Sequence, residues 1–107
     1  MASGRLGTPA DMSATTLTTI YTVPANTFAV ASINVLNRGA SAVTVRLALA
    51  ATDTPTAAEY IEYDISVPAK SVLERTGLVL STTQKIVAYS SATSVSVVAY
   101  GIETPTA

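Results

Sequence analysis

Hydrophobic and polar positions alternate in short runs along most of this chain. The clearest run spans residues 42–50, in which Val43, Val45, Leu47 and Leu49 occupy alternate positions. Successive side chains of a β-strand point to opposite faces of its sheet, so a period of two indicates one buried face and one outer face. This run therefore predicts a half-buried strand.

Seven runs of this kind follow residue 16, each rich in Val, Ile, Thr and Tyr and bounded by turn-forming residues. They predict strands at residues 17–23, 28–36, 42–50, 59–67, 72–80, 85–90 and 94–104. No segment shows the period of a helix. Short, closely spaced strands without helices predict an all-β fold, an antiparallel β-sandwich of jelly-roll-like type with about seven strands.

The second predicted strand contains a change of phase. Phe28 and Val30 share one parity, whereas Ile33 and Val35 share the other. An extra residue in a strand reverses the faces that follow it, so the sequence predicts a β-bulge or bend near residues 31–32.

Turns and loops between the strands are of two kinds. The turn at residues 37–41 contains Asn and Gly, which adopt positive φ readily, and it predicts a hairpin of the second and third strands. The loop at residues 51–58 is the longest connection between predicted strands. Loops on a rigid sandwich often carry binding residues, so this loop is the first candidate for a contact loop. The alternative is a solvated turn in which Asp53 and Pro55 are ordinary turn residues.

The first sixteen residues mix Gly, Pro, Ser and Thr without apolar periodicity. We therefore predict an extended N-terminal arm over residues 1–16 that does not pack in the core, followed by a single β-sandwich domain over residues 17–107. The arm has no apolar stretch of the kind that a secretory signal needs. It could lie on a neighbouring subunit, and fraying disorder is the alternative.

Charge and hydropathy change the picture of the surface. Charged residues make up 12% of the chain, the net charge is −1, and the six basic residues are scattered, which argues against nucleic acid as a partner. No run approaches the 18 apolar residues of a membrane span. The mean hydropathy is nonetheless +0.42, so part of the surface is expected to be buried in a homo-oligomer. The alternative is that the many Thr and Ser residues solvate it.

Catalytic chemistry finds few candidate residues. The chain has no cysteine, which excludes disulfides and thiolate metal sites, and no histidine, the commonest general base and metal ligand. Lys70 and Lys85 are interpreted as surface lysines. The five glycines are isolated, so no phosphate-binding loop is present. We therefore expect no enzyme activity, no cofactor, and no catalytic, cofactor-binding or metal-ligating residue.

Carboxylates gather only in the segment EYIEYD. On a regular strand Glu62 and Asp64 share one face, and Glu59 and Tyr63 lie on the other. We interpret this segment as a polar outer face that pairs with Arg46, with a weak cation site as the alternative.

Aromatic side chains could stack on sugars or bases. Without clustered Arg or Trp, the tyrosines are interpreted as core or boundary residues. They are Tyr21, Tyr60, Tyr63, Tyr89 and Tyr100.

Nearly the whole chain apart from the arm resembles small virion structural proteins of tailed bacteriophages, including those of marine and cyanobacterial phages. The most specific pieces are YTVPA, the INVLNRG turn, the YIEYD strand, the GLVLSTTQKIVAYSS hairpin and the terminal AYGIE. None of these is a catalytic motif, so the resemblance implies a location and a role without implying a site.

The resemblance implies a protein of the virion, assembled in the host cytoplasm. Its expected function is that of a capsid decoration or cement protein, with the major capsid protein or other virion proteins as partners. The alternative is a tail fibre or adhesin module that recognises a host-surface glycan. One short domain without repeats or heptads favours decoration. By analogy with proteins on local three-fold axes, a trimer is the expected oligomer.

Overall fold

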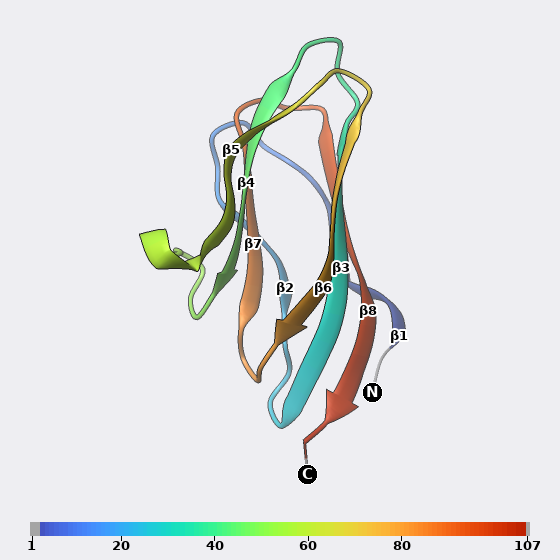
Figure 1. Ribbon diagram of the computed structural model, residues 1–107, viewed down its shortest axis with the longest axis vertical. Helices are drawn as coiled ribbons and strands as arrows, with labels where there is room; N and C mark the ends of the chain where they lie inside the picture. The colour runs from blue at the N-terminus through green and yellow to red at the C-terminus, as the bar shows by residue number, and fades with distance from the viewer. Residues whose placement is uncertain (1–2, 107) are drawn as a thin grey trace.

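The computed structural model describes residues 3–106, and this part of the chain forms eight strands in two antiparallel sheets packed face to face (Figure 1). The all-β sandwich predicted from the sequence is confirmed. The strands are β1 (Ser3–Asp11), β2 (Thr18–Thr22), β3 (Thr27–Asn37), β4 (Val43–Ala50), β5 (Tyr60–Val67), β6 (Val72–Leu80), β7 (Lys85–Ser90) and β8 (Val95–Pro105), and a short 3-10 helix, η1 (Ala57–Glu59), precedes β5.

The strands are ordered β1-β8-β3-β6 in the first sheet and β2-β7-β4-β5 in the second sheet. Only β4 and β5 are consecutive strands paired in one sheet, and every other connection in the described chain crosses between the sheets. Eight strands that alternate between two sheets in this way form a jelly roll. Each of the seven predicted strands has a counterpart, from β2 to β8.

Two predicted hairpins are wrong, the one at residues 37–41 and the one in the segment GLVLSTTQKIVAYSS. The turn at residues 38–42 carries the chain from β3 in the first sheet to β4 in the second, and β6 and β7 also belong to different sheets. The side chain of Asn37 stabilises the crossover from β3 to β4 rather than a hairpin turn. Its buried amide nitrogen donates to the carbonyl oxygens of Ser41, Val67 and Pro68, at 2.8, 3.0 and 3.2 Å, which binds three segments together.

The prediction that the N-terminal segment stays outside the core is wrong for the described residues. β1 pairs with β8, and Leu6 and Met12 are each only 2% exposed. The sequence shows no alternation here because the register shifts between Leu6 and Ala10, with two extra residues on β1. Residues 1–2 of the predicted arm and residue 107 of the predicted domain lie outside the described residues.

The predicted bulge is present at the expected level but on the neighbouring strand. Ala31 of β3 lies opposite Leu78 of β6, and Ile33 lies opposite Arg75, so the extra residue is on β6. The register of β3 against β8 is unbroken. The inner positions of β3 include the small residues Ala29 and Ala31, whereas the larger Val30 faces outward. The more hydrophobic residue is therefore on the outer face, and this is why the sequence pattern predicted a change of phase within β3.

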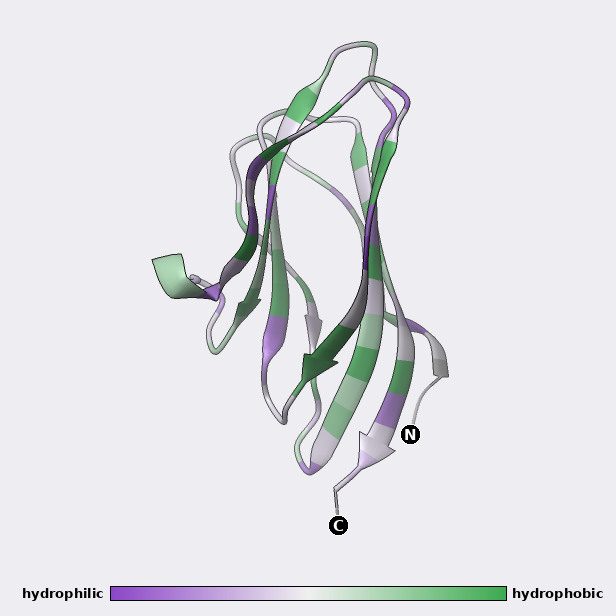
Figure 2. Cartoon of the chain, viewed as in Figure 1, coloured by the Kyte–Doolittle hydropathy of each residue, from purple (hydrophilic) through white to green (hydrophobic). Residues whose placement is uncertain are grey.

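The core lies between the two sheets and receives side chains from every strand. Figure 2 shows hydrophobic and hydrophilic residues alternating along much of the sheets. Burial of apolar surface is the main favourable term in folding, so this shared core holds the layers together. Its largest fully buried members include Leu6, Ile33, Leu47, Leu80 and Ile86.

All four edge strands are irregular, whereas the central pairs are regular. The registers of β3 with β8 and of β4 with β7 are continuous. The register shifts of β1, β2, β5 and β6 each place the extra residues on the edge strand itself. Irregular edges discourage the addition of a strand from another chain. Contacts with partners are therefore expected on the faces of the sandwich.

Candidate functional site

The described residues contain no pocket and no group of three or more Asp or Glu side chains placed to hold a metal ion. In the same part of the chain, none of the helical structure has the length and apolar character to cross a membrane. The candidate surfaces are the outer faces of the two sheets.

The outer face of the second sheet carries a tyrosine–arginine cluster, formed by Arg46, Tyr60, Tyr63, Asp64 and Tyr89. The guanidinium carbon of Arg46 lies 4.2 Å from the ring centre of Tyr63 and 4.6 Å from that of Tyr89. Arg46 also donates from Nε and Nη2 to the two carboxylate oxygens of Asp64, at 2.7 and 3.3 Å. The predicted pairing with Arg46 is confirmed for Asp64.

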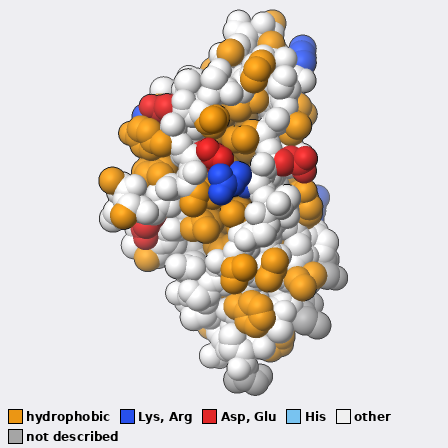
Figure 3. All heavy atoms as spheres, viewed as in Figure 1, with side chains coloured by type: hydrophobic (Ala, Val, Ile, Leu, Met, Phe, Trp, Pro, Cys, Tyr) orange, Lys and Arg blue, Asp and Glu red, His pale blue; other side chains and the backbone are white. Residues whose placement is uncertain are grey.

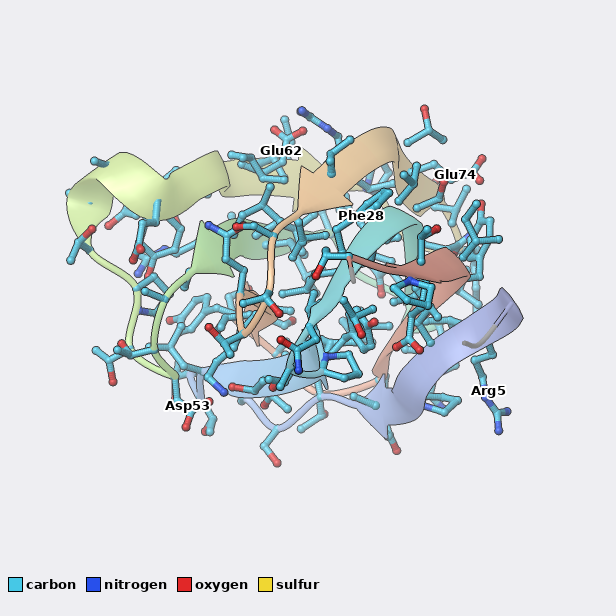
Figure 4. All side chains as sticks on the ribbon, turned by 90° about the horizontal axis from the view of Figure 1, so that it is seen from below. Arg5, Phe28, Asp53, Glu62 and Glu74 are labelled. Atoms are coloured by element: carbon cyan, nitrogen blue, oxygen red, sulfur yellow. The ribbon has the colours of Figure 1, made fainter. Side chains whose placement is uncertain are left out.

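A bulge in β5 builds this cluster from adjacent residues. Asp64 has a φ of +53°, and the register against β4 shifts at this point. Tyr63 and Asp64 therefore both reach Arg46, although a regular strand would place them on opposite faces. The prediction that Glu62 and Asp64 act on one face is wrong, because Glu62 pairs instead with Arg75 of β6 at 2.6 Å. Figure 4 shows Glu62 at the side of the sandwich where these edge strands meet.

The cluster satisfies its own charges. The hydrogen bonds to Asp64 raise the pKa of Arg46, which keeps the guanidinium charged. Both neighbouring rings and both carboxylate oxygens already contact it. Tyr60 meets Tyr63 edge to face at 5.1 Å, while Tyr63 itself remains 61% exposed. This arrangement stabilises the bulge and leaves little unpaired charge for a ligand.

The predicted contact loop at residues 51–58 is bound to its own sandwich. The carboxylate of Glu59 accepts hydrogen bonds from the backbone nitrogens of Thr56 and Ala51, at 2.8 and 3.1 Å, and these bonds lower the pKa of Glu59. Asp53 accepts a hydrogen bond from Thr19 of β2 at 2.5 Å, and Figure 4 shows Asp53 beside that strand. A contact function for this loop stays a prediction.

The other candidate side chains do not converge. Tyr21 is buried and donates to Glu103 of the opposite sheet; burial and this bond raise the pKa of Tyr21. The Nζ atom of Lys70 donates to a backbone carbonyl at 2.7 Å, and that of Lys85 to the hydroxyl of Thr22 at 3.2 Å. These groups hold the fold together rather than form one site.

The outer face of the first sheet has a different chemistry. Its apolar face, defined by Phe28, Val30, Val79, Tyr100 and Ile102, spans the three strands β3, β6 and β8. Val30 lies directly opposite both Val79 and Ile102, so these three side chains form one row. They are 37%, 63% and 50% exposed. Figure 3 shows hydrophobic side chains gathered over the lower ends of these strands.

Charged residues border the apolar face at opposite edges of the sheet. Arg5 on β1 lies opposite Tyr100 of β8, and Glu74 on β6 lies opposite Asn34 of β3. The hydroxyl of Tyr100 donates to Glu74 at 3.1 Å, across the intervening strand β3. Figure 4 shows Arg5 and Glu74 beside opposite edges of this sheet and on the same side of the molecule. The face therefore has an uncharged centre between a positive and a negative border.

The sequence alone does not reveal this face, because Phe28 and Val30 repeat with the period of a buried strand face although they lie on the outer side of β3. The outer parities of β3, β6 and β8 each contain a large aliphatic residue at the same level. That coincidence becomes visible only when the register of the three strands is known.

Comparison of the chain with protein-family models, with curated proteins and with solved structures finds no match. The likeness of the sequence to tailed-phage virion proteins therefore stays a prediction.

Proposed function

We propose that this chain is a non-enzymatic structural protein of a tailed-phage virion, a decoration or cement protein that stabilises junctions between capsid subunits. The observation that carries the proposal is the apolar face of the first sheet. Exposed aliphatic residues that are cross-strand neighbours indicate a surface that is buried in the working form. The resemblance of the sequence supports the location in a virion, and it supports the capsid proteins as partners.

The size of the apolar row fits a cementing role. Full burial of a Val or Ile side chain contributes about 1.5–3 kcal/mol, and roughly half of each side chain in the row is still exposed. Burying the remainder of Val30, Val79 and Ile102 would contribute roughly 2–4 kcal/mol before ordering costs. A protein that binds only the assembled particle stabilises that particle by about 2.7 kcal/mol per site when its free concentration is one hundred times its Kd, which is a similar free energy. The total stabilisation of a particle grows with the number of bound copies.

The faces of the sandwich carry this role rather than an N-terminal clasp. Residues 3–11 form β1 and pair with β8 of the same chain. A clasp built from these residues would have to break that pairing and withdraw Leu6 from the core.

Particles that lack the protein provide the test. Purified chain is added back, and we expect it to bind at saturable copy number and to raise the temperature at which the particles release DNA. Ile102→Asp should lower the occupancy, because it places a charge in the apolar row. The control is Ser66→Asp, an exposed position on β5 that pairs with Thr44 on the second sheet. Absence of binding, or binding without any gain in particle stability, contradicts the proposal.

A further inference from the structure

We propose that the apolar face of the first sheet is covered by a second copy of this chain. The two copies pack face to face about a two-fold axis that lies between them and runs parallel to the strands. This inference names the partner of a surface on which the proposed function also relies, and it is tested on the isolated protein.

The symmetry determines which strands meet. A two-fold axis parallel to the strands, midway across the sheet, reverses the strand order β1-β8-β3-β6 and keeps the position along each strand. β8 then lies over β3 of the partner subunit, and β1 lies over its β6. Ile102 and Val30 are at the same level of the sheet. Ile102 of each copy therefore faces Val30 of the partner subunit, and both contacts are apolar.

The charged borders are complementary under the same rotation. Arg5 on β1 comes over β6 of the partner subunit, close to the level of Glu74. Their levels differ by about two residues, or about 7 Å along the strands, which a long Arg side chain can span. The symmetry makes this pair twice. In an aligned packing, a two-fold axis perpendicular to the strands would instead place β1 over β1, and it would bring like charges together. The charge pattern therefore selects the parallel axis.

The outer face of the whole first sheet, which contains the apolar face, is large enough for a dimer interface. β3 has eleven residues, which at about 3.3 Å each span about 36 Å, and four strands at about 4.8 Å span about 19 Å. Because β1 and β6 have nine residues each, the sheet covers about 600 Å² per subunit, which approaches the roughly 800 Å² per partner of a standard interface. The two sheets would pack in the aligned manner of a β-sandwich.

A symmetric dimer also suits the cementing role. It presents every remaining surface of the chain twice, so each copy can bind one capsid subunit while the buried apolar face joins the two copies across the junction. The irregular edge strands disfavour the alternative of joining copies through a continuous sheet.

The first test is the mass of the purified chain by light scattering over a dilution series. We expect a species of twice the 11.0 kDa chain mass that dissociates on dilution. Ile102→Asp should weaken the dimer by at least about tenfold, because it places an unpaired charge against Val30 of the partner subunit. Ser66→Asp on the other sheet should leave the dimer unchanged. A monomer at all concentrations, or the trimer expected by analogy with other virion proteins, overturns the proposal.

The second test is a charge exchange. Arg5→Glu and Glu74→Arg should each weaken the dimer by about tenfold, since each change replaces two attractive contacts by two repulsive ones. The double variant R5E/E74R should restore the affinity to within a few-fold of the original. Circular dichroism and thermal unfolding verify that each variant folds. If both single variants weaken the dimer and the double variant does not recover, the two-fold arrangement is wrong.

The two proposals fail separately. A chain that is monomeric in solution but occupies and stabilises particles contradicts the dimer and leaves the cement function standing. A chain that forms the charge-dependent dimer but does not bind particles supports the interface and contradicts the function.

Discussion

The two outer faces of the sandwich are both rich in large side chains, but they differ in how completely those side chains are paired. On the second sheet, Arg46 lies between two tyrosine rings and binds Asp64 through both carboxylate oxygens. On the first sheet, Val79 and Ile102 lie opposite Val30 on either side of it, and the three side chains are 63%, 50% and 37% exposed.

Exposure alone therefore does not identify an interaction surface. Tyr63 is among the most exposed hydrophobic residues of the described chain, at 61%, yet it belongs to a cluster whose charges are satisfied. Val79 is similarly exposed, and its neighbours on the face are apolar. A surface that gains free energy when a partner covers it is one whose groups are not already paired.

The largest expected effect concerns the backbone that supports the apolar face. Gly101 lies between Tyr100 and Ile102 with a φ of +150°, and a Cβ atom there would come within 2.1 Å of the carbonyl oxygen of Val30. Gly101→Ala should therefore lower the free energy of unfolding by about 3 kcal/mol or more. Urea denaturation measures it.

The matched control for this substitution is Gly77→Ala on the edge strand β6. Gly77 also has a positive φ, of +70°, but a Cβ atom there would meet nothing within 4 Å. Only the cost of the backbone conformation remains, about 1–2 kcal/mol. Equal losses for the two variants would show that the close approach of β8 to β3 is not what requires Gly101.

The next effect compares an inner with an outer tyrosine. Tyr21 is buried and joins the two sheets through Glu103, whereas Tyr100 bonds to Glu74 on the outer face. Tyr21→Phe should lower the free energy of unfolding by about 1–2 kcal/mol, because it removes a bond to a partly buried carboxylate. Tyr100→Phe should have a smaller effect, since water can replace the lost bond. A larger loss for Tyr100→Phe would contradict this ranking.

The contribution of Tyr21 to stability should depend on pH. Burial first, and then the bond to Glu103, raise the pKa of Tyr21 in the folded chain. Its stabilising contribution is therefore complete below the ordinary tyrosine pKa of about 10, and it is lost as the pH rises above that value. Unfolding measured from about pH 8 to 11 should show a steeper alkaline loss of stability for the natural chain than for Tyr21→Phe. Parallel curves would rule out this role.

A smaller effect separates the two outer faces directly. Asp64→Asn removes the ion pair with Arg46, while Asn still adopts the positive φ of this position. The free energy of unfolding should fall only slightly, because solvent screens this partly exposed pair, and self-association should not change. Ile102→Asp should weaken self-association and leave the free energy of unfolding nearly unchanged. If Asp64→Asn weakened association, the tyrosine–arginine cluster would belong to an interface.

The smallest effect is confined to the loop at residues 51–58. Backbone hydrogen bonds lower the pKa of Glu59, so their stabilising effect is present above the ordinary pKa of about 4.3 and is lost as the pH falls through the lowered value. Hydrogen exchange should show protected Ala51 and Thr56 amides near neutral pH that become less protected in acid. Glu59→Gln should reduce this protection near neutral pH, and its difference from the original chain should disappear in acid, without any change in global unfolding. Unchanged protection in Glu59→Gln would exclude the carboxylate as the anchor.

Much of the strand content could be predicted because it depends on local alternation. The run at residues 42–50 shows a period of two, and β4 forms there with Val43, Val45 and Leu47 buried. β1 could not be predicted in the same way. Its irregular register removes the alternation, and its stability comes from backbone pairing with β8, which any sequence of suitable shape can make.

The candidate surfaces were less predictable than the strands. Pairing of the EYIEYD segment with Arg46 followed from charge, but the bulge that places Tyr63 beside Asp64 did not. The apolar row can be recognised only when the registers of β3 with β6 and of β3 with β8 are known. Both β6 and β8 are far from β3 in the sequence. Such registers depend on long-range contacts, and a shift of one residue reverses every face.

Alternation and composition are local properties, so the amino-acid sequence was enough to predict an all-β sandwich and to exclude cysteine and histidine chemistry. The place of β1 in the core and of Val30 on the outer face depends instead on the assembled sandwich. The same holds for Arg5 and Glu74, which border one apolar face only because of the strand order. The physical reason is that an inner position is defined by the sheet packed against it, and that sheet is assembled from strands distant in the chain.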